Sequence, residues 1–402
     1  MKKLLALLIA IIMVMGLVAC GGDKKEDTAK DDSKKAEDVK EEAADDKKEE
    51  AADDKKEEAA DDKKEEAADD KKEEEVDEAD LPVLRLGVFD SRSSFVNWYI
   101  MENGLDVANG FKIEPTVSTA GGSFLNEAIG TGKIDATQIA AAQAVFSASV
   151  YDCINVVEFS EASGSSAIFA RPDSDEAQII GDNPDFPEVR GSAETIKGKT
   201  FMYPTGSMSQ LTVAKYLEVF GLTLDDIDSI NTQYGPGYQA LQAGEGDTVT
   251  LFSPLTLFAE SDGYVALASM DQLGQSVRDC LMVTPEAYNN PEKMDTIKKW
   301  ITVLFECNEK FQEDKEWQRE ELEKFHAFYG NDISDPAMLD TEINKHYLLT
   351  VDEAMASLDD LGKSALAVGQ YYYEIGIIEE DALEKIENNV DKSIMQELYG
   401  DK

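Results

Sequence analysis

Beyond about position 80, alternating apolar and polar positions predict a regular succession of strands and helices. Residues 82–90 form an apolar run that predicts a buried strand, and 94–105 follow with apolar residues at helical spacing. The pattern repeats with predicted strands at 111–118, 133–140 and 153–160. Strands that alternate with helices at this spacing are typical of a mostly parallel sheet covered by helices.

A second series of the same kind starts after Gly191. It contains predicted strands at 195–204 and 247–255 and a helix at 208–221, and from Pro291 onward the pattern is helical. The repeated rhythm predicts an α/β protein of two similar lobes, the second inserted in the first. We assign residues 81–170 to the first part of lobe 1, 171–263 to lobe 2, and 264–402 to the completion of lobe 1 with C-terminal helices.

The first twenty residues have the pattern of a secretory signal. Lys2 and Lys3 precede the apolar run Leu4–Val14, and the small-residue stretch LVAC ends at Cys20. The run is shorter than the ~20 apolar residues of a membrane span. LVAC followed by glycine resembles a bacterial lipobox, which implies removal of residues 1–19 and a diacylglycerol group on Cys20. Two acyl chains anchor a protein stably, so we expect it on the extracytoplasmic face of the cell membrane.

Residues 20–80 differ in composition from the rest of the chain. The octad EEAADDKK occurs four times between Glu41 and Lys72, and residues 21–80 hold 29 acidic residues and 14 lysines. Acidic residues recur at i,i+4 and there is no apolar stripe to bury. We therefore expect a disordered charged tether rather than a stable helix.

Charge and rare residues exclude several classes of function. The chain carries a net charge of −45, of which −32 falls on residues 81–402, so DNA or RNA binding is not expected. His326 and His346 are the only two histidines, and no nucleophile–His–acid set or metal motif is visible, so we expect no enzyme activity, metal or cofactor. Beyond Cys20 three cysteines remain; one disulfide is possible, but buried free thiols are favoured for Cys153, Cys280 and Cys307.

The predicted ligand site lies where strands end and helices begin. In an open α/β sheet, ligands bind outside the carboxyl ends of the strands, and helix N-termini with free amides favour anions. Serine, threonine and glycine dominate these ends, although the same residues are also ordinary caps and turns. The predicted ligand-binding residues are Ser91, Arg92, Ser93, Trp98, Gly121, Gly122, Ser123, Gln138, Thr205, Gly206, Ser207, Tyr234 and Ser253.

Arg92 is the most informative of these residues. It is one of six arginines and directly follows the first predicted strand, where its guanidinium would hold a carboxylate or sulfonate through two hydrogen bonds. The alternative is an arginine of a solvent-facing loop. Trp98 and Tyr234 would favour an organic ligand, or else belong to the core.

Two segments resemble a known family. LNEAIGTGKIDATQI (125–139) and the stretch 196–255 are similar to elements of the substrate-binding proteins of ABC transporters, the group that binds nitrate, taurine, sulfonates and thiamine precursors. The resemblance covers about 83–270. It implies a two-lobed periplasmic-binding-protein-like fold of the type II kind. The chain departs from the group's pattern by an insertion at 175–192 and by the absence of a tryptophan near Ser253.

The resemblance and the lipobox together favour a solute receptor. We expect it to capture a small ligand (a sulfonate, a carboxylate or a heterocycle) between its lobes and to deliver the ligand to the permease of an ABC transporter. We expect a monomer. The alternative is a surface lipoprotein, a sensor or an adhesin, that uses the same fold without transport.

Overall fold

The structure is a computed structural model that describes residues 78–118 and 122–400, all within one compact unit. The predicted signal peptide, Cys20 and most of the predicted tether lie outside the described residues. The last residues of the predicted tether, Glu78–Asp80, form a short 3-10 turn, η2, just before the first strand.

Lobe 1 is built on a six-stranded sheet with the order β11-β4-β10-β3-β1-β2. Strands β1 to β4 run in the same direction. In contrast, β10 is antiparallel to both β3 and β4, and β11 is antiparallel to β4. The strands are β1 (Val83–Phe89), β2 (Lys112–Ser118), β3 (Ala136–Ala140), β4 (Ile154–Glu161), β10 (Arg278–Val283) and β11 (Tyr347–Leu348).

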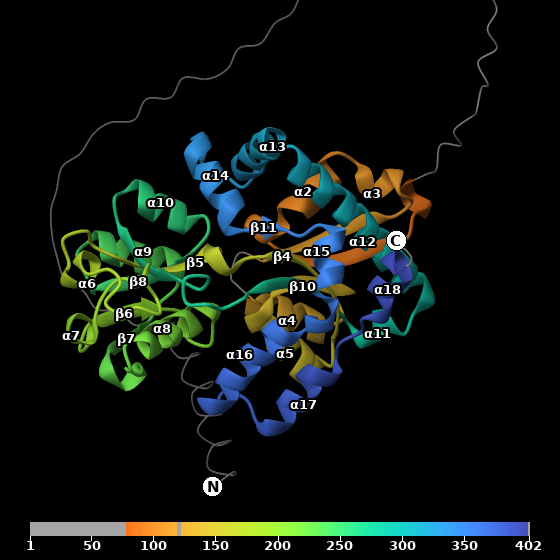
Figure 1. The fold of residues 1–402 in the computed structure, drawn as a ribbon. Helices are drawn as coiled ribbons and strands as arrows, with labels where there is room; N and C mark the ends of the chain where they lie inside the picture. The colour runs from red at the N-terminus through yellow and green to blue at the C-terminus, as the bar shows by residue number, and fades with distance from the viewer. Residues whose placement is uncertain (1–77, 119–121, 401–402) are drawn as a thin grey trace, which may run out of the picture. The chain divides into compact units, whose positions relative to one another are not determined.

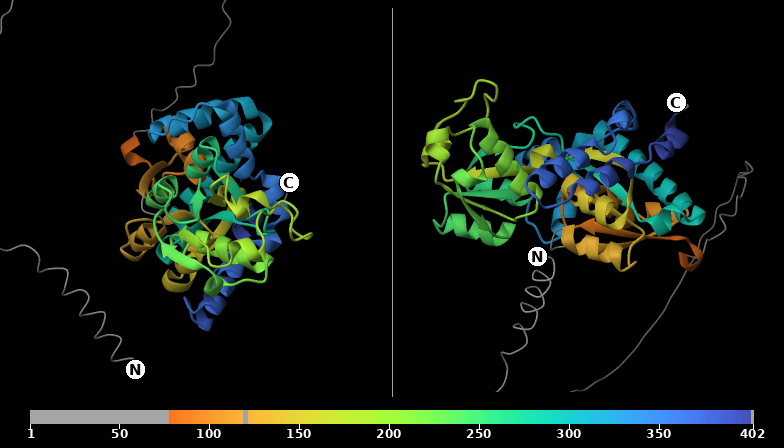
Figure 2. Two further views of the ribbon diagram at one scale, coloured as in Figure 1. Left: turned by 90° about the vertical axis from the view of Figure 1, so that its left-hand side faces the viewer. Right: turned by 90° about the horizontal axis from the view of Figure 1, so that it is seen from below.

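Lobe 2 is built on a five-stranded sheet with the order β7-β6-β8-β5-β9. Here β6 is parallel to β7 and β8, whereas β5 is antiparallel to β8 and β9. The strands are β5 (Ser166–Ala170), β6 (Thr200–Tyr203), β7 (Asp228–Asn231), β8 (Thr248–Phe252) and β9 (Val265–Ser269). Figure 2 shows this lobe, coloured yellow to green, beside lobe 1.

The predicted two-lobed α/β fold is confirmed, with two corrections. Both sheets are mixed, because β10 in lobe 1 and β5 in lobe 2 are antiparallel to their neighbours. These two strands lie next to the two segments in which the chain crosses between the lobes. The predicted limits of lobe 2, 171–263, omit β5 and β9, which pair in the sheet of lobe 2. The chain therefore enters lobe 2 before Ser166 and leaves it after Ser269.

Helices flank both sheets (Figure 1). Those of the first part of lobe 1 are α2 (Phe95–Glu102), α3 (Leu105–Ala108), α4 (Gly122–Gly130) and α5 (Ala141–Tyr151). Those of lobe 2 are α6 (Asp175–Gln178), α7 (Ala193–Ile196), α8 (Met208–Val219), α9 (Tyr234–Gln242) and α10 (Leu255–Ser261). The C-terminal helices are α11 (Pro285–Tyr288), α12 (Pro291–Glu313), α13 (Lys315–Phe328), α14 (Pro336–Lys345), α15 (Val351–Ala356), α16 (Lys363–Glu374), α17 (Glu380–Asn388) and α18 (Ser393–Tyr399). Short 3-10 turns are η3 (Arg92–Ser94), η4 (Ser163–Ser165), η5 (Leu224–Asp226) and η6 (Leu358–Asp360).

The long helix α12 illustrates how the sequence sets an element. The Asn290 side chain accepts hydrogen bonds from the amides of Glu292 and Lys293, and Pro291 occupies the first helical position. Its apolar stripe is buried in the core of lobe 1 at Ile297 and Leu304, whereas Met294 near its start is half-buried. The helical pattern predicted from Pro291 onward is confirmed here.

The three cysteines of the folded region are all free and buried, as the sequence favoured. Cys307 lies within α12, Cys280 in β10, and Cys153 just before β4. No disulfide therefore links Cys153, Cys280 and Cys307 in the structure.

Candidate functional site

The carboxyl ends of the strands of lobe 1 converge at one edge of its sheet. Arg92 follows β1, and Ser160 lies near the end of β4. Because β10 is antiparallel, its beginning lies at this same edge, where Asp279 pairs with Ala140 of β3 and with Ser160. This is the edge at which open α/β sheets bind ligands.

Arg92 is buried at this edge without a hydrogen-bond partner. Its side chain is 1% exposed, and Nε, Nη1 and Nη2 all lack an acceptor. Its Cζ lies 4.5 Å from the centroid of the Phe95 ring, a cation–π contact. Burial lowers the pKa of Arg92 to about 10, against the opposing effect of the carboxylates of Glu342 and Asp279. The solvent-facing alternative for Arg92 is therefore wrong.

Two buried carboxylates lie near Arg92, and each is paired with a histidine. Glu342 accepts a hydrogen bond from Ser253 on one oxygen, and its other oxygen lies 2.6 Å from Nε2 of His326. Burial alone would raise the pKa of Glu342, but His326, Arg92 and Ser253 lower it.

Asp279 is the second of these carboxylates. Its Oδ2 accepts from the Ser160 hydroxyl at 2.9 Å and lies 2.9 Å from Nε2 of His346. The other ring nitrogen of His346 lies 3.3 Å from the hydroxyl of Ser165. Both histidines of the chain are thus buried, and each is paired with one of the two carboxylates that act on Arg92. We call Arg92, these two carboxylates and their partners the buried network.

Several atoms of this network lack partners. Besides the three nitrogens of Arg92, they include Oδ1 of Asp279 and Nδ1 of His326. Nearly all buried polar groups in proteins form hydrogen bonds, so these atoms make the buried network a candidate ligand site.

The helix α14 brings this network to the boundary between the lobes. It lies beside α13 and contacts α10 of lobe 2 (Figure 1). Glu342 of α14 binds Ser253 of the β8–α10 loop, and Lys345, one turn later, forms an ion pair with Glu260 of α10. A Cβ on Gly164 would lie 2.9 Å from the backbone of Lys345, so η4 passes close to the end of this helix.

A second contact between the lobes is aromatic. Tyr371 and Tyr372 of α16 are buried in the same apolar cluster as Tyr203 of lobe 2. Burial raises the pKa of Tyr371 to about 12 and also raises the pKa of Tyr372, with smaller effects from Tyr203 and Tyr234 respectively. These rings form a continuous apolar core between α16 and lobe 2.

The structure separates the predicted residues of lobe 1 into two groups. Arg92 belongs to the buried network, and Ser91 is half-buried beside it. The side chain of Gln138 instead donates to the Ser93 carbonyl and accepts from Asn97, so its hydrogen bonds are made inside lobe 1. Trp98 packs among aromatic rings, 5.7 Å from the centroid of Phe325. Gly121 lies outside the described residues; Gly122 and Ser123 start α4.

The predicted residues of lobe 2 are likewise divided. Ser253 reaches the network through Glu342. The amides of Thr205 and Gly206 donate to the side chains of Asn231 and Gln210, at 3.0 and 2.7 Å, so they are already paired within the lobe. Ser207 bonds the Pro204 carbonyl, and the hydroxyl of Tyr234 accepts from Ser209. The expected open amides are thus absent from Thr205 and Gly206.

Sequence reasoning missed the other residues of the buried network. These are Ser160, Ser165, Asp279, His326, Glu342 and His346. A signal was present in α14: Leu339, Glu342, Ile343 and His346 follow i, i+3, i+4 and i+7, and all four are buried. Ionisable residues on the apolar stripe of a helix are candidates for a site.

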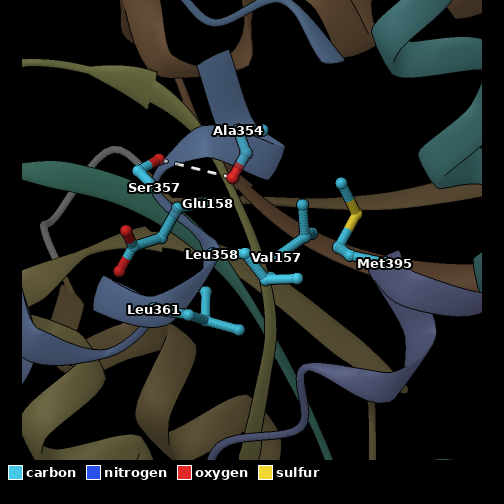
Figure 3. Close-up of a pocket in the computed structure, with 7 residues that line it drawn as sticks. All are labelled: Val157, Glu158, Ala354, Ser357, Leu358, Leu361 and Met395. Atoms are coloured by element: carbon cyan, nitrogen blue, oxygen red, sulfur yellow. Dashed lines mark hydrogen bonds between the residues drawn. The ribbon is translucent and has the colours of Figure 1, made fainter. Parts of the chain in front are cut away.

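Two hollows are lined by residues outside this network. One, of about 510 Å³, opens where the chain passes between the lobes and is lined by residues that include Glu161, Asp271 and Lys345. The other is a small hollow at η6, lined by residues that include Glu158, Leu358 and Leu361 (Figure 3). Its volume of about 10 Å³ suits one water molecule rather than a solute.

Within residues 78–118 and 122–400, no three His, Cys, Asp or Glu side chains are grouped so that they could hold a metal ion. Among the helices of this same part of the chain, none is long and apolar enough to cross a membrane.

Comparison with known proteins identifies the family. No family model matches the sequence. An ABC transporter periplasmic binding protein of Brachyspira hyodysenteriae is 30% identical over 316 residues, which cover 79% of this chain and 89% of the relative.

Solved structures agree in fold. The alkanesulfonate-binding protein SsuA of Xanthomonas axonopodis, bound to MOPS, superposes with a TM-score of 0.59 at 16% identity, over 77% of this chain and 98% of its own. The nitrate-binding protein NrtA of Synechocystis gives a TM-score of 0.57 at 13% identity, over 80% and 89%. The chain belongs to the ABC transporter periplasmic binding proteins, receptors that deliver a solute to a membrane permease.

Proposed function

We propose that this receptor captures a small organic anion at the boundary between its lobes, with Arg92 as the residue that binds the anionic group. The observation that carries the proposal is the guanidinium of Arg92, which is 1% exposed and has no hydrogen-bond partner on any nitrogen. Burying a charge without partners is costly, and a bound anion would remove that cost through charge-assisted hydrogen bonds.

The surroundings of Arg92 support a site that spans both lobes. Glu342 lies near Arg92 and binds Ser253 of lobe 2, so a ligand at Arg92 would be close to the contact between the lobes. Closure of hinged lobes around a ligand is a common transition in binding proteins of this kind. SsuA and NrtA, which share the fold, bind sulfonate and nitrate, and both ligands are anions.

The test is a binding screen with the wild-type protein and an Arg92→Gln variant. Thermal-shift and calorimetric measurements would compare ethanesulfonate, propionate, nitrate and a neutral hydroxymethylpyrimidine. Loss of one charge-assisted hydrogen-bond pair corresponds to about 1.5–3 kcal/mol, or roughly a 10- to 150-fold weaker Kd, for the anions that bind. Arg319→Gln, which removes a half-buried arginine paired with Asp340, is the matched control.

Two results would contradict the proposal. One is unchanged affinity for every anion in the Arg92→Gln variant while its fold, measured by circular dichroism, stays intact. The other is preferential binding of the neutral pyrimidine, unaffected by the substitution.

The lipid anchor belongs to the same proposal. Cys20 follows an apolar run and the LVAC motif, and a diacylglycerol on its thiol would hold the receptor at the outer face of the membrane, next to the permease. Residues 20–77 would then separate the anchor from the folded receptor, which acts as a monomer.

A further inference from the structure

We propose that the helices α10 and α14 form a clasp across the boundary between the lobes, and that the ion pair of Lys345 with Glu260 in this clasp sets how far the receptor is closed. The clasp consists of Ser253, Leu257 and Glu260 of lobe 2 and of Leu339, Glu342, Ile343 and Lys345 of α14. Its contacts are made between protein groups alone, so the inference holds for any solute and does not depend on the proposed anion.

The clasp joins two helices that belong to different lobes. The helix α10 follows β8 of the lobe 2 sheet, whereas α14 leads into β11 of the lobe 1 sheet. The chain crosses between these sheets at residues 162–165 and 270–277, neither of which belongs to α10 or α14. The two helices therefore meet through packing and side-chain contacts. A hinge movement of one lobe against the other must change these contacts.

The first part of the clasp is apolar. Leu257 of α10 is 2% exposed and is buried in the same apolar cluster as Leu339 and Ile343 of α14. This cluster is otherwise the core of lobe 1, although Leu257 belongs to a helix of lobe 2. Separating the lobes at this point would expose apolar area to water, which disfavours the separation.

The second part of the clasp is polar and holds α10 at two points. The Ser253 hydroxyl, just before α10, donates to Glu342, and Nζ of Lys345 donates to the carboxylate of Glu260 near the end of α10. Seven residues separate Ser253 from Glu260, which is about two turns of helix. Contacts at both ends fix the direction of α10 against α14, whereas a single contact would let the helix pivot.

The end of α14 also meets a segment in which the chain crosses between the lobes. A Cβ on Gly164 would lie 2.9 Å from both the Cα and the carbonyl oxygen of Lys345. Beside this contact, the hollow of about 510 Å³ is lined by both crossing segments and by Asn344 and Lys345. Protein interiors are normally close-packed, so this space leaves room for the crossing segments to bend. The clasp restrains that bending at Lys345.

The ion pair suits an adjustable contact. The side chains of Lys345 and Glu260 are 27% and 35% exposed, and pairs of this kind contribute little to the stability of a fold. Lys345 and Glu260 also lie outside the buried network, so substituting them leaves Arg92 and its carboxylates in place. A contribution of this size still changes the ratio of two conformations by roughly 1.5- to 5-fold.

The experiment measures the distance between the lobes without added solute. Nitroxide labels are placed on Glu127→Cys in α4 and Gln239→Cys in α9, both exposed positions, in a full chain that carries Cys20→Ser. The three other cysteines are buried and do not compete for the label. Pulsed electron paramagnetic resonance then gives the share of receptor whose label distance matches the structure. Lys345→Met should lower the ratio of this form to more open forms by roughly 1.5- to 5-fold. Gly164→Ala should shift the ratio in the same direction, because its Cβ displaces the backbone of Lys345.

Charge variants and a matched control complete the test. Lys345→Glu should open the receptor further than Lys345→Met, and adding Glu260→Lys to it should restore the wild-type ratio. Lys298→Met breaks the ion pair with Glu397 inside lobe 1, where the lysine is equally exposed at 27%, and should leave the ratio unchanged. Circular dichroism checks that each variant is folded.

Three outcomes would overturn the inference. They are an unchanged ratio in both Lys345→Met and Lys345→Glu, a failure of the charge swap to restore the ratio, and an equal shift in Lys298→Met. If Gly164→Ala does not fold, the variants of Lys345 and Glu260 decide alone. None of these outcomes affects the anion site at Arg92, which the binding screen tests separately.

Discussion

The guanidinium of Arg92 rests on the ring of Phe95, with 4.5 Å between Cζ and the ring centroid. Arg92 is the first residue of η3, and Phe95, three positions later, is the first residue of α2. Phe95 itself is fully buried and packs against Phe311, with the rings tilted by 43° and 4.8 Å between centroids. The unpartnered charge is thus held in place by the aromatic core of lobe 1 rather than by hydrogen bonds.

This relationship predicts the effect of Phe95→Leu. Replacing the ring removes buried area and the cation–π contact, so we expect a loss of about 1–3 kcal/mol in the free energy of unfolding and weaker binding of any Arg92-dependent ligand. Urea unfolding measures the first effect and calorimetry the second. Phe328→Leu, at a phenylalanine that is 62% exposed, should change stability by less than about 0.5 kcal/mol. Equal effects of the two substitutions would argue against a supporting role for Phe95.

Glu158 predicts a pH dependence of stability. Burial raises its pKa from 4.5 to about 7, although the amide of Gly362 donates to it at 3.0 Å. Because the folded-state pKa lies above the unfolded value, this contribution to stability is fully present below pH 4.5 and is lost as pH rises through 7. We expect the loss to be on the order of 3 kcal/mol.

Glu158→Gln is the substitution that tests this dependence. Gln keeps the acceptor for Gly362 but does not ionise, so the variant should be more stable than wild type at pH 8 and nearly equal to it at pH 4.5. Urea unfolding across this range measures the difference. Parallel curves for the two proteins would show that Glu158 does not titrate in the folded state near neutral pH.

The cysteines predict resistance to alkylation. Burial raises the pKa of Cys153 and Cys307 to about 12 and raises the pKa of Cys280 well above its usual value. The thiolate is the reactive form, so none of the three should react with a maleimide at pH 7.5 within an hour, and all should react in denaturant. Peptide mapping by mass spectrometry identifies which cysteines carry the maleimide label. Rapid labelling of one cysteine in native protein would reveal an opening of the core at that position.

The proposed anchor predicts the behaviour of Cys20→Ser. Without the thiol there is no site for the lipid, so the variant should lose labelling by a fatty-acid probe and appear in the soluble extracytoplasmic fraction. Phase separation in detergent and cell fractionation measure this. A variant that stays in the membrane fraction would mean that Leu4–Val14 remains as a membrane segment.

The sequence by itself determined the alternation of strands and helices, the two-lobed class and the buried state of the cysteines. These features follow from local periodicity, as in α12, where the apolar stripe and the Asn290 cap are both visible in the sequence. It also singled out Arg92, because a rare cation directly after a strand is a local signal.

The tertiary structure alone decided what surrounds Arg92. Asp279 and His346 lie far from Arg92 in sequence. The antiparallel β10 and the end of α14 bring these two residues together at the same edge of the sheet, and no local pattern reveals a pairing over such a distance along the chain. The same reason explains the correction at Thr205 and Gly206, whose amides are taken by Asn231 and Gln210. The start of a helix predicts which backbone amides lack a partner within the helix. Which side chains accept hydrogen bonds from those amides depends on tertiary contacts, which the sequence does not reveal.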